Sequence, residues 1–184
     1  MKNRSSIRNM TMAAVCVALC VVLPIAFHSI PDAGSVFLPM HIPVLICGMI
    51  CGWPYGLLCG LMGPLVSSAL TGMPPIAFLP AMMVECGTYG LVSGLMLKYV
   101  HTRSTYADLY IALVVAMIAG RVVSGIAKAL IFTPGLALSA WVTASFVTAL
   151  PGIIIQLVFL PSVVCTLMKA KVIPQRYAKG QITA

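Results

Sequence analysis

Long apolar runs alternate along the chain with short breaks that are rich in proline, glycine or polar residues. A helix needs roughly 20 residues to cross the hydrocarbon core of a bilayer, and most of these runs approach that length. The breaks at Gly52-Trp53-Pro54 and Met73-Pro74-Pro75 separate neighbouring runs, because proline cannot continue the interior of a helix. The last run also has room for an interfacial start or a kink at Pro151-Gly152. The pattern predicts six membrane-spanning helices, at about residues 10–27, 39–52, 54–70, 80–99, 109–132 and 139–168.

Composition places the whole chain in lipid as one membrane domain, residues 1–184. The residues are 61% hydrophobic and 8% charged, whereas about a quarter of a soluble domain is charged. A soluble fold of this length buries only about 70% of its surface, so it could not hide this much apolar area. We therefore predict an all-α integral membrane protein, a bundle of six helices with little soluble mass.

The net charge of +8 comes from basic residues that flank the predicted helices, and we do not expect a nucleic-acid partner. Of the eleven lysines and arginines, only Arg121 and Lys128 lie away from a helix end or a terminus. The connections 28–38, 71–79 and 133–138 contain none. Because cytoplasmic loops carry the excess of Lys and Arg, both termini are predicted in the cytoplasm and these three connections outside the cell.

Away from the helix ends, three charged side chains fall inside the predicted helices: Glu85, Arg121 and Lys128. A charge at membrane depth costs several kcal/mol and usually faces the bundle interior or a water-filled cavity. Glu85 and Lys128 each lie about 7 Å from the predicted outer helix ends, at a rise of about 1.5 Å per residue. Arg121 lies two turns below Lys128 on the same helix face. This placement predicts an outward-opening cavity of net charge +1, although a structural ion pair between helices is the alternative.

Polar and aromatic side chains lie near these charged residues along the predicted helices. Thr88 and Tyr89 follow Glu85 by one turn, and Ser124 lies between the two cations. The last predicted helix carries a stripe of Trp141, Ser145, Thr148, Gly152 and Gln156. Such stripes also form where membrane helices only pack. The candidate substrate-binding residues are Glu85, Arg121, Lys128, Trp141, Thr88, Tyr89, Ser124 and Phe78, with Trp141 and Phe78 as candidates for stacking.

Residue types that carry chemistry in other proteins do not form a recognisable enzyme or metal motif. The seven cysteines all lie in apolar runs, where cysteine behaves as a small hydrophobe, and no zinc-ligand spacing surrounds them. The sequence has no GxxxxGK[ST] phosphate loop and no GxSxG or HExxH motif. His28 and His41 flank the first outer connection and are interpreted as interfacial side chains, with a ligand contact as the alternative. We expect no metal, no cofactor bound by this chain and no enzyme activity.

Four runs carry a family resemblance: LPMHIPV at 38–44, CGWPYG at 51–56, GPLVSSALTGMPP at 63–75 and MMVECGTYGLV at 82–92. Together they resemble the vitamin-binding S components of energy-coupling factor (ECF) transporters. The pair Ala14 and Ala18 resembles the family's small-residue docking motif; packing inside the chain is the alternative for such small residues.

The resemblance implies a multi-pass subunit of a cell membrane, of bacterial type, that binds a water-soluble vitamin from outside in the outer half of its last three helices. Connections 28–38 and 71–79 would act as the lid. The first three helices would dock on a transmembrane scaffold subunit driven by two cytoplasmic ATPases, which use the ATP. The +1 cavity favours an anionic substrate such as pantothenate. One alternative is a stand-alone proton-driven transporter of a small polar solute with Glu85 as relay, and an intramembrane enzyme ranks last.

Overall fold

A computed structural model describes residues 2–27, 33–132 and 137–173, and within these ranges the regular structure is helical, with no strand. The elements are α1 (Lys2–Ala26), α2 (Ala33–Phe37), α3 (His41–Cys51), α4 (Trp53–Thr71), α5 (Leu79–Tyr99), α6 (Thr105–Ala127), the π-helix η1 (Lys128–Phe132), α7 (Leu138–Val142), the π-helix η2 (Thr143–Thr148) and α8 (Leu150–Lys169). Among the described residues, four segments are long and apolar enough to cross a membrane: Ser6–Ala26, Gly34–Cys51, Thr105–Phe132 and Leu150–Lys169. The prediction of a helical membrane protein is confirmed at this level.

The other two predicted ranges, 54–70 and 80–99, fall on α4 and α5, which are not among those four segments. Both helices have sufficient length, at 19 and 21 residues. Helix α4 contains several glycines, serines and prolines, and α5 contains Glu85. These residues serve packing and the polar site, as described below.

Two glycines end helices where the sequence predicts breaks. Gly52 separates α3 from α4 with φ of 89°, and Gly72 caps α4 with φ of 72° while its N–H bonds to the Ser68 carbonyl. A positive φ is accessible to glycine at little steric cost. The chain therefore reverses direction at these two positions.

The last predicted range, 139–168, with its allowance for an interfacial start or a kink, corresponds to three elements. The segment divides into α7, η2 and α8, and the junction lies at Ala149 rather than at Pro151-Gly152. Pro151 occupies the first turn of α8, where a missing N–H costs nothing and the fixed φ suits a helix start. The first helix also begins earlier than predicted, at Lys2, and the first outer connection contains the short helix α2.

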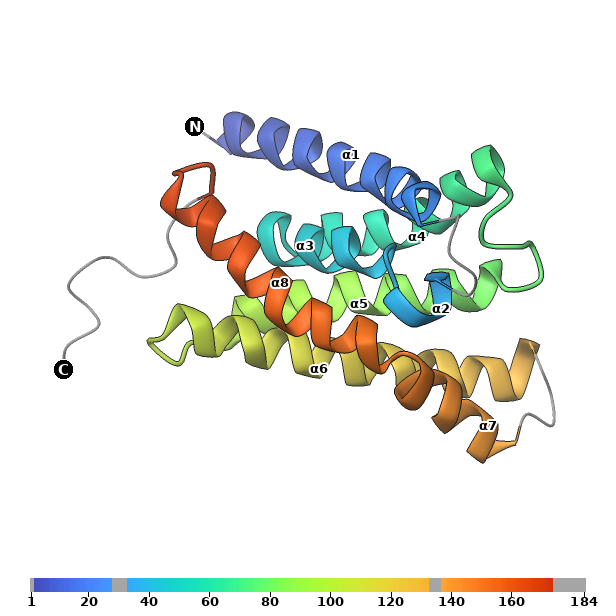
Figure 1. Ribbon diagram of the computed structural model, residues 1–184. Helices are drawn as coiled ribbons and strands as arrows, with labels where there is room; N and C mark the ends of the chain where they lie inside the picture. Colours follow the sequence, from blue (N-terminus) through green and yellow to red (C-terminus); the bar gives the residue numbers. More distant parts are fainter. Residues whose placement is uncertain (1, 28–32, 133–136, 174–184) are drawn as a thin grey trace.

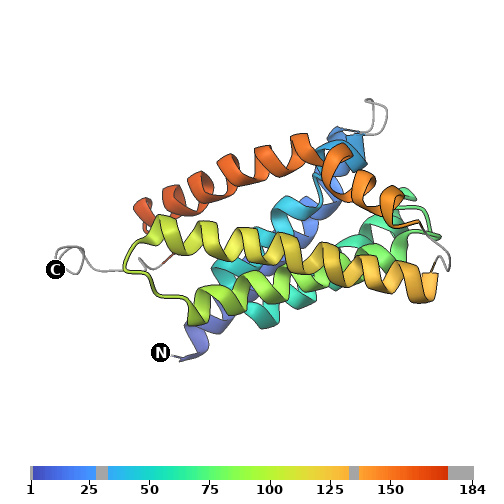
Figure 2. The ribbon, with the colours of Figure 1, turned by 90° about the horizontal axis from the view of Figure 1, so that it is seen from below.

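The long helices run back and forth, so that α1 begins and α8 ends at the same end of the bundle in both views (Figures 1 and 2). The opposite end holds α2, the α4–α5 connection and α7 (Figure 1). Helix α5 lies at the centre, packed against α3, α4 and α6, while α1 packs on α3 and α4. The end that holds α2 and α7 is where the candidate site lies.

Close approach of backbones fixes α5 against α3 and α4. A Cβ added to Gly90 would overlap the backbone of Gly56, and one added to Gly60 would overlap the Cys86 carbonyl. A Cβ on Gly48 would likewise overlap the Gly90 carbonyl. Small residues allow this approach in lipid, where packing replaces the hydrophobic effect as the main attraction between helices. The glycines Gly48, Gly56 and Gly60 of α3 and α4 therefore form an internal packing surface against α5.

Gly90→Ala is expected to lower the free energy of unfolding by about 1–3 kcal/mol, because the Gly56 backbone cannot move aside as a flexible side chain would. Thermal unfolding of the purified protein in detergent measures this loss. Gly34→Ala is the matched control, since nothing lies within 4 Å of its added Cβ. Equal melting temperatures for the two variants would contradict the packing account.

Candidate functional site

A cavity of about 770 Å³ opens between the ends of the helices at the α2 and α7 end of the bundle. Its charged and titratable lining residues are His41, Glu85, Arg121 and Lys128. They come from the start of α3, from α5, from α6 and from the first residue of η1. The remaining lining is mainly apolar and includes Phe27, Met40, Met73, Pro74, Phe78 and Met82. The cavity thus has one polar region within largely apolar walls.

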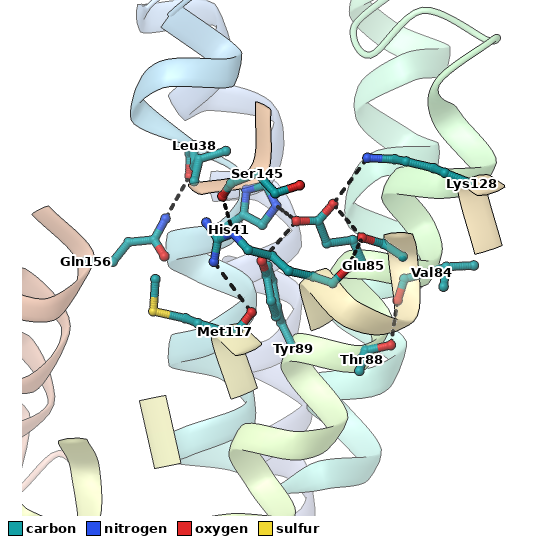
Figure 3. A network of polar contacts seen from close by, with 12 residues as sticks. Leu38, His41, Val84, Glu85, Thr88, Tyr89, Met117, Lys128, Ser145 and Gln156 are labelled. Carbon is teal, nitrogen blue, oxygen red and sulfur yellow. Dashed lines mark hydrogen bonds and ion pairs between the residues drawn. The ribbon is translucent and has the colours of Figure 1, made fainter. Parts of the chain in front are cut away.

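Glu85 is the centre of the polar region, with a side chain 14% exposed. The Tyr89 hydroxyl donates to Oε1 at 2.9 Å, and the Ser124 hydroxyl donates to Oε2 at 3.2 Å. The Lys128 ammonium lies 3.8 Å from Oε2, and the His41 Nε2 lies 3.6 Å from Oε1. Figure 3 shows His41, Tyr89 and Lys128 around this carboxylate. Both carboxylate oxygens are therefore engaged by groups of the protein itself.

Arg121 is 3% exposed and has a different set of partners. Its Nε donates to the Ser145 carbonyl at 2.7 Å, and its Nη1 donates to the Met117 carbonyl at 3.5 Å. Its guanidinium carbon lies 6.0 Å from the Tyr89 ring centroid and 5.7 Å from that of Phe146. Cations are attracted to aromatic faces at such distances. Arg121 forms no ion pair with any carboxylate of the described ranges.

His41 is buried beside the cavity. It is 2% exposed, and its ring meets the Tyr89 ring edge-on at a centroid distance of 5.1 Å. Neither ring nitrogen has a hydrogen-bond partner in the described part of the chain. The available signal was the place of His41 in LPMHIPV, near the start of the predicted helix 39–52 and beside the first outer connection. His28 lies outside the described residues.

The other candidates divide between the cavity and its surroundings. Phe78 lines the cavity with 66% of its surface exposed, and Tyr89 and Ser124 lie behind Glu85. Thr88 is not at the cavity, because its hydroxyl donates to the Val84 carbonyl of the same helix at 2.7 Å. Trp141 is also outside the lining and packs edge-on against Phe146 at 5.8 Å.

The stripe predicted on the last helix is only partly at the site. Ser145 lines the cavity and supplies a carbonyl to Arg121, which sequence reasoning did not anticipate. Buried Gln156 instead donates to the Leu38 carbonyl at 3.4 Å and ties α8 to the start of α3. Thr148 is exposed. Residues 143–148 form the π-helix η2, which has a different number of residues per turn from an α-helix. The regular α-helical spacing that predicted the stripe therefore does not hold through this segment.

The cysteines are free thiols buried in the bundle. Among the described residues, no group of three or more His, Cys, Asp or Glu side chains is placed to hold a metal ion.

The family model described as "ECF transporter, substrate-specific component" matches residues 8–164. The chain belongs to this family. The predicted family resemblance is thereby confirmed over most of the sequence, well beyond residues 38–92. Comparisons with curated proteins and with solved structures gave no match.

Membership makes this protein a substrate-binding subunit of a membrane transporter and not an enzyme. The family implies a vitamin-type substrate and an interaction with the ECF module. The apolar helices agree with a membrane location. The cavity is the feature of the described structure that is suited to hold a small molecule.

Proposed function

We propose that this ECF substrate-specific component captures a water-soluble vitamin or related micronutrient from outside the cell and delivers it inward when docked on an ATP-driven module. The cavity of about 770 Å³ is the observation that carries the proposal. Small-molecule sites typically measure about 300–1,000 Å³ and combine apolar walls with a few convergent polar groups. The region around Glu85 and Arg121 has this character.

The proposed topology has six membrane crossings: α1, α3, α4, α5, α6 with η1, and α8. The start of α1 and the end of α8 lie at one end (Figure 1), which would face the cytoplasm. The cavity end, whose connections lack Lys and Arg, would face outward by the positive-inside rule. Exposed apolar side chains on α4, among them Leu58 and Leu70, support a lipid-facing surface for that helix. The cell membrane would be bacterial.

The proposed docking surface is the outer face of α1. Ala14 and Ala18 are exposed there, whereas Cys16 and Cys20 on the opposite face are buried against the bundle. Only 11% of the apolar stretch Ser6–Ala26 is buried within the chain. Small exposed residues allow close approach of a second membrane helix. The proposed partners are a transmembrane scaffold subunit and two ATPases; ATP is used there, and this chain binds no cofactor.

The described residues of the cavity lining carry a formal charge of +1, from two cations and Glu85, which favours an anionic substrate such as pantothenate. A stand-alone proton-driven transporter is the second candidate function. It is favoured by one observation, the buried pair of titratable side chains His41 and Glu85, 3.6 Å apart at the cavity. That candidate requires uptake without any ATPase partner.

The purified protein in detergent is expected to be stabilised by one member of a vitamin panel. At a ligand concentration of about 100 times Kd, mass action gives about 2.7 kcal/mol of stabilisation. The melting temperature measures it and should rise with ligand concentration. No stabilisation across the panel, together with proton-linked uptake into liposomes that contain this chain alone, would instead establish the second candidate.

Ala18→Trp is expected to leave vitamin binding unchanged and to abolish uptake through the complete transporter, because a large side chain blocks close helix approach at α1. Uptake into cells that express the ECF module measures the effect. Ile118→Trp is the control, since Ile118 is exposed at 52% on α6, away from α1. Normal uptake by Ala18→Trp would place docking elsewhere.

A further inference from the structure

Among the described residues that line the cavity, one cation lacks a counter-charge. The ion pair between Glu85 and Lys128 joins the one anion of this described lining to one of its two cations. Oxygen Oε1 is also engaged by Tyr89 and His41, and Oε2 by Ser124. Glu85 has therefore little remaining capacity to accept hydrogen bonds from a ligand, and its charge is already balanced.

Arg121 carries the remaining charge. The partners that the structure gives it are two backbone carbonyls and two aromatic rings. These groups offer partial negative charge only, and a buried cation without an anionic partner is unfavourable. The side chain nevertheless lines the cavity. A guanidinium in such a place is suited to a carboxylate, which it binds through two parallel hydrogen bonds.

His41 supplies a second and independent observation. Its Nδ1 is buried and has no polar partner within the described ranges, whereas its Nε2 has only the 3.6 Å contact with Glu85, which is longer than a hydrogen bond. The residue lines the cavity. Buried polar side-chain atoms are normally paired. The imidazole therefore has hydrogen-bonding capacity that a bound molecule can satisfy.

We propose that the substrate is a small carboxylic acid with a mainly apolar remainder, and that Arg121 binds its carboxylate. This inference rests on the proposed function. Glu85 is then a positioning residue that holds Lys128 and Tyr89 in place and does not contact the anionic group. The apolar part of the acid lies against the walls formed by Phe27, Phe78 and Met82.

The test uses matched pairs of compounds that differ in the carboxylate alone: nicotinate with nicotinamide, biotin with biotinamide, and pantothenate with panthenol, its alcohol. Neutral and cationic vitamins complete the panel. Affinity is measured for the purified full chain by thermal shift and by titration calorimetry. An acid should bind, and its neutral partner should bind about 10- to 100-fold more weakly, as expected for loss of a charge-assisted hydrogen bond.

Three variants locate the carboxylate. Arg121→Gln should reduce affinity for the acid to that for its neutral partner, whereas Arg121→Lys should keep part of the preference. Arg8→Gln makes the same change at an exposed position of α1 and should bind like the parent protein. The melting temperature of each variant without ligand shows whether it is folded. If Arg121→Gln does not fold, Arg121→Lys is used in its place to test the preference for the acid.

Glu85→Gln tests the positioning role. Loss of the Glu85 charge frees Lys128 and makes the cavity more positive, so affinity for the acid should rise severalfold while affinity for the neutral partner stays unchanged. A merely structural role would weaken both compounds equally. Loss of acid binding in Glu85→Gln alone would mean that Glu85 contacts the ligand and would overturn the assignment.

Two outcomes separate this inference from the proposed function. Strong binding of a neutral or cationic vitamin, with no response to any acid, would overturn the carboxylate assignment and leave the vitamin-binding function intact. If no compound of the panel binds to the folded, monodisperse protein, this result would contradict both the carboxylate assignment and the proposed function.

Discussion

A carboxylate buried inside a lipid-facing bundle needs a positive partner and hydrogen-bond donors, and the site depends on how Glu85 obtains them. Its partners come from α3, α5, α6 and η1, so satisfying this one charge fixes the relative positions of the helix ends that surround the cavity. The same contacts decide the electrostatics of the cavity. Since Lys128 balances Glu85, Arg121 is left as the charge that a ligand meets.

That network is placed by packing deeper in the bundle. Backbone contacts between glycines hold α5 against α3 and α4, with Gly90 on Gly56 and Gly60 on the Cys86 carbonyl. Cys86 directly follows Glu85 in sequence, so the depth and rotation of the carboxylate follow from the close approach of α4. The tightly packed part of the protein and its polar site are therefore parts of one arrangement. The helices that achieve it, α4 and α5, are not among the four described segments that meet the length and composition of a membrane crossing.

The sequence was most informative where one physical rule dominates. Glycine and proline predicted the breaks at Gly52 and at 71–79, and the cost of charge in lipid singled out Glu85, Arg121 and Lys128, which all line the cavity. Contacts that depend on three dimensions were not predictable: the burial of His41, the carbonyl of Ser145 that binds Arg121, and the π-helices that shift the register of 128–132 and 143–148. Thr88 and Trp141 had the expected helical spacing but lie outside the described cavity lining, because helical spacing indicates a face of the helix and not a depth. The Thr88 hydroxyl is bonded within its own helix, and the Trp141 ring packs on Phe146. Roles in substrate binding stay predictions for all of these residues.

Family membership gives the class of subunit, and the cavity gives the place where this member would hold its substrate. An experimental structure of the protein with its stabilising vitamin tests that assignment most directly. The account predicts ligand density within the cavity between Arg121 and Phe78, with the Glu85–Lys128 pair intact. Density at another surface of the bundle, or a ligand inserted between Glu85 and Lys128, would contradict it.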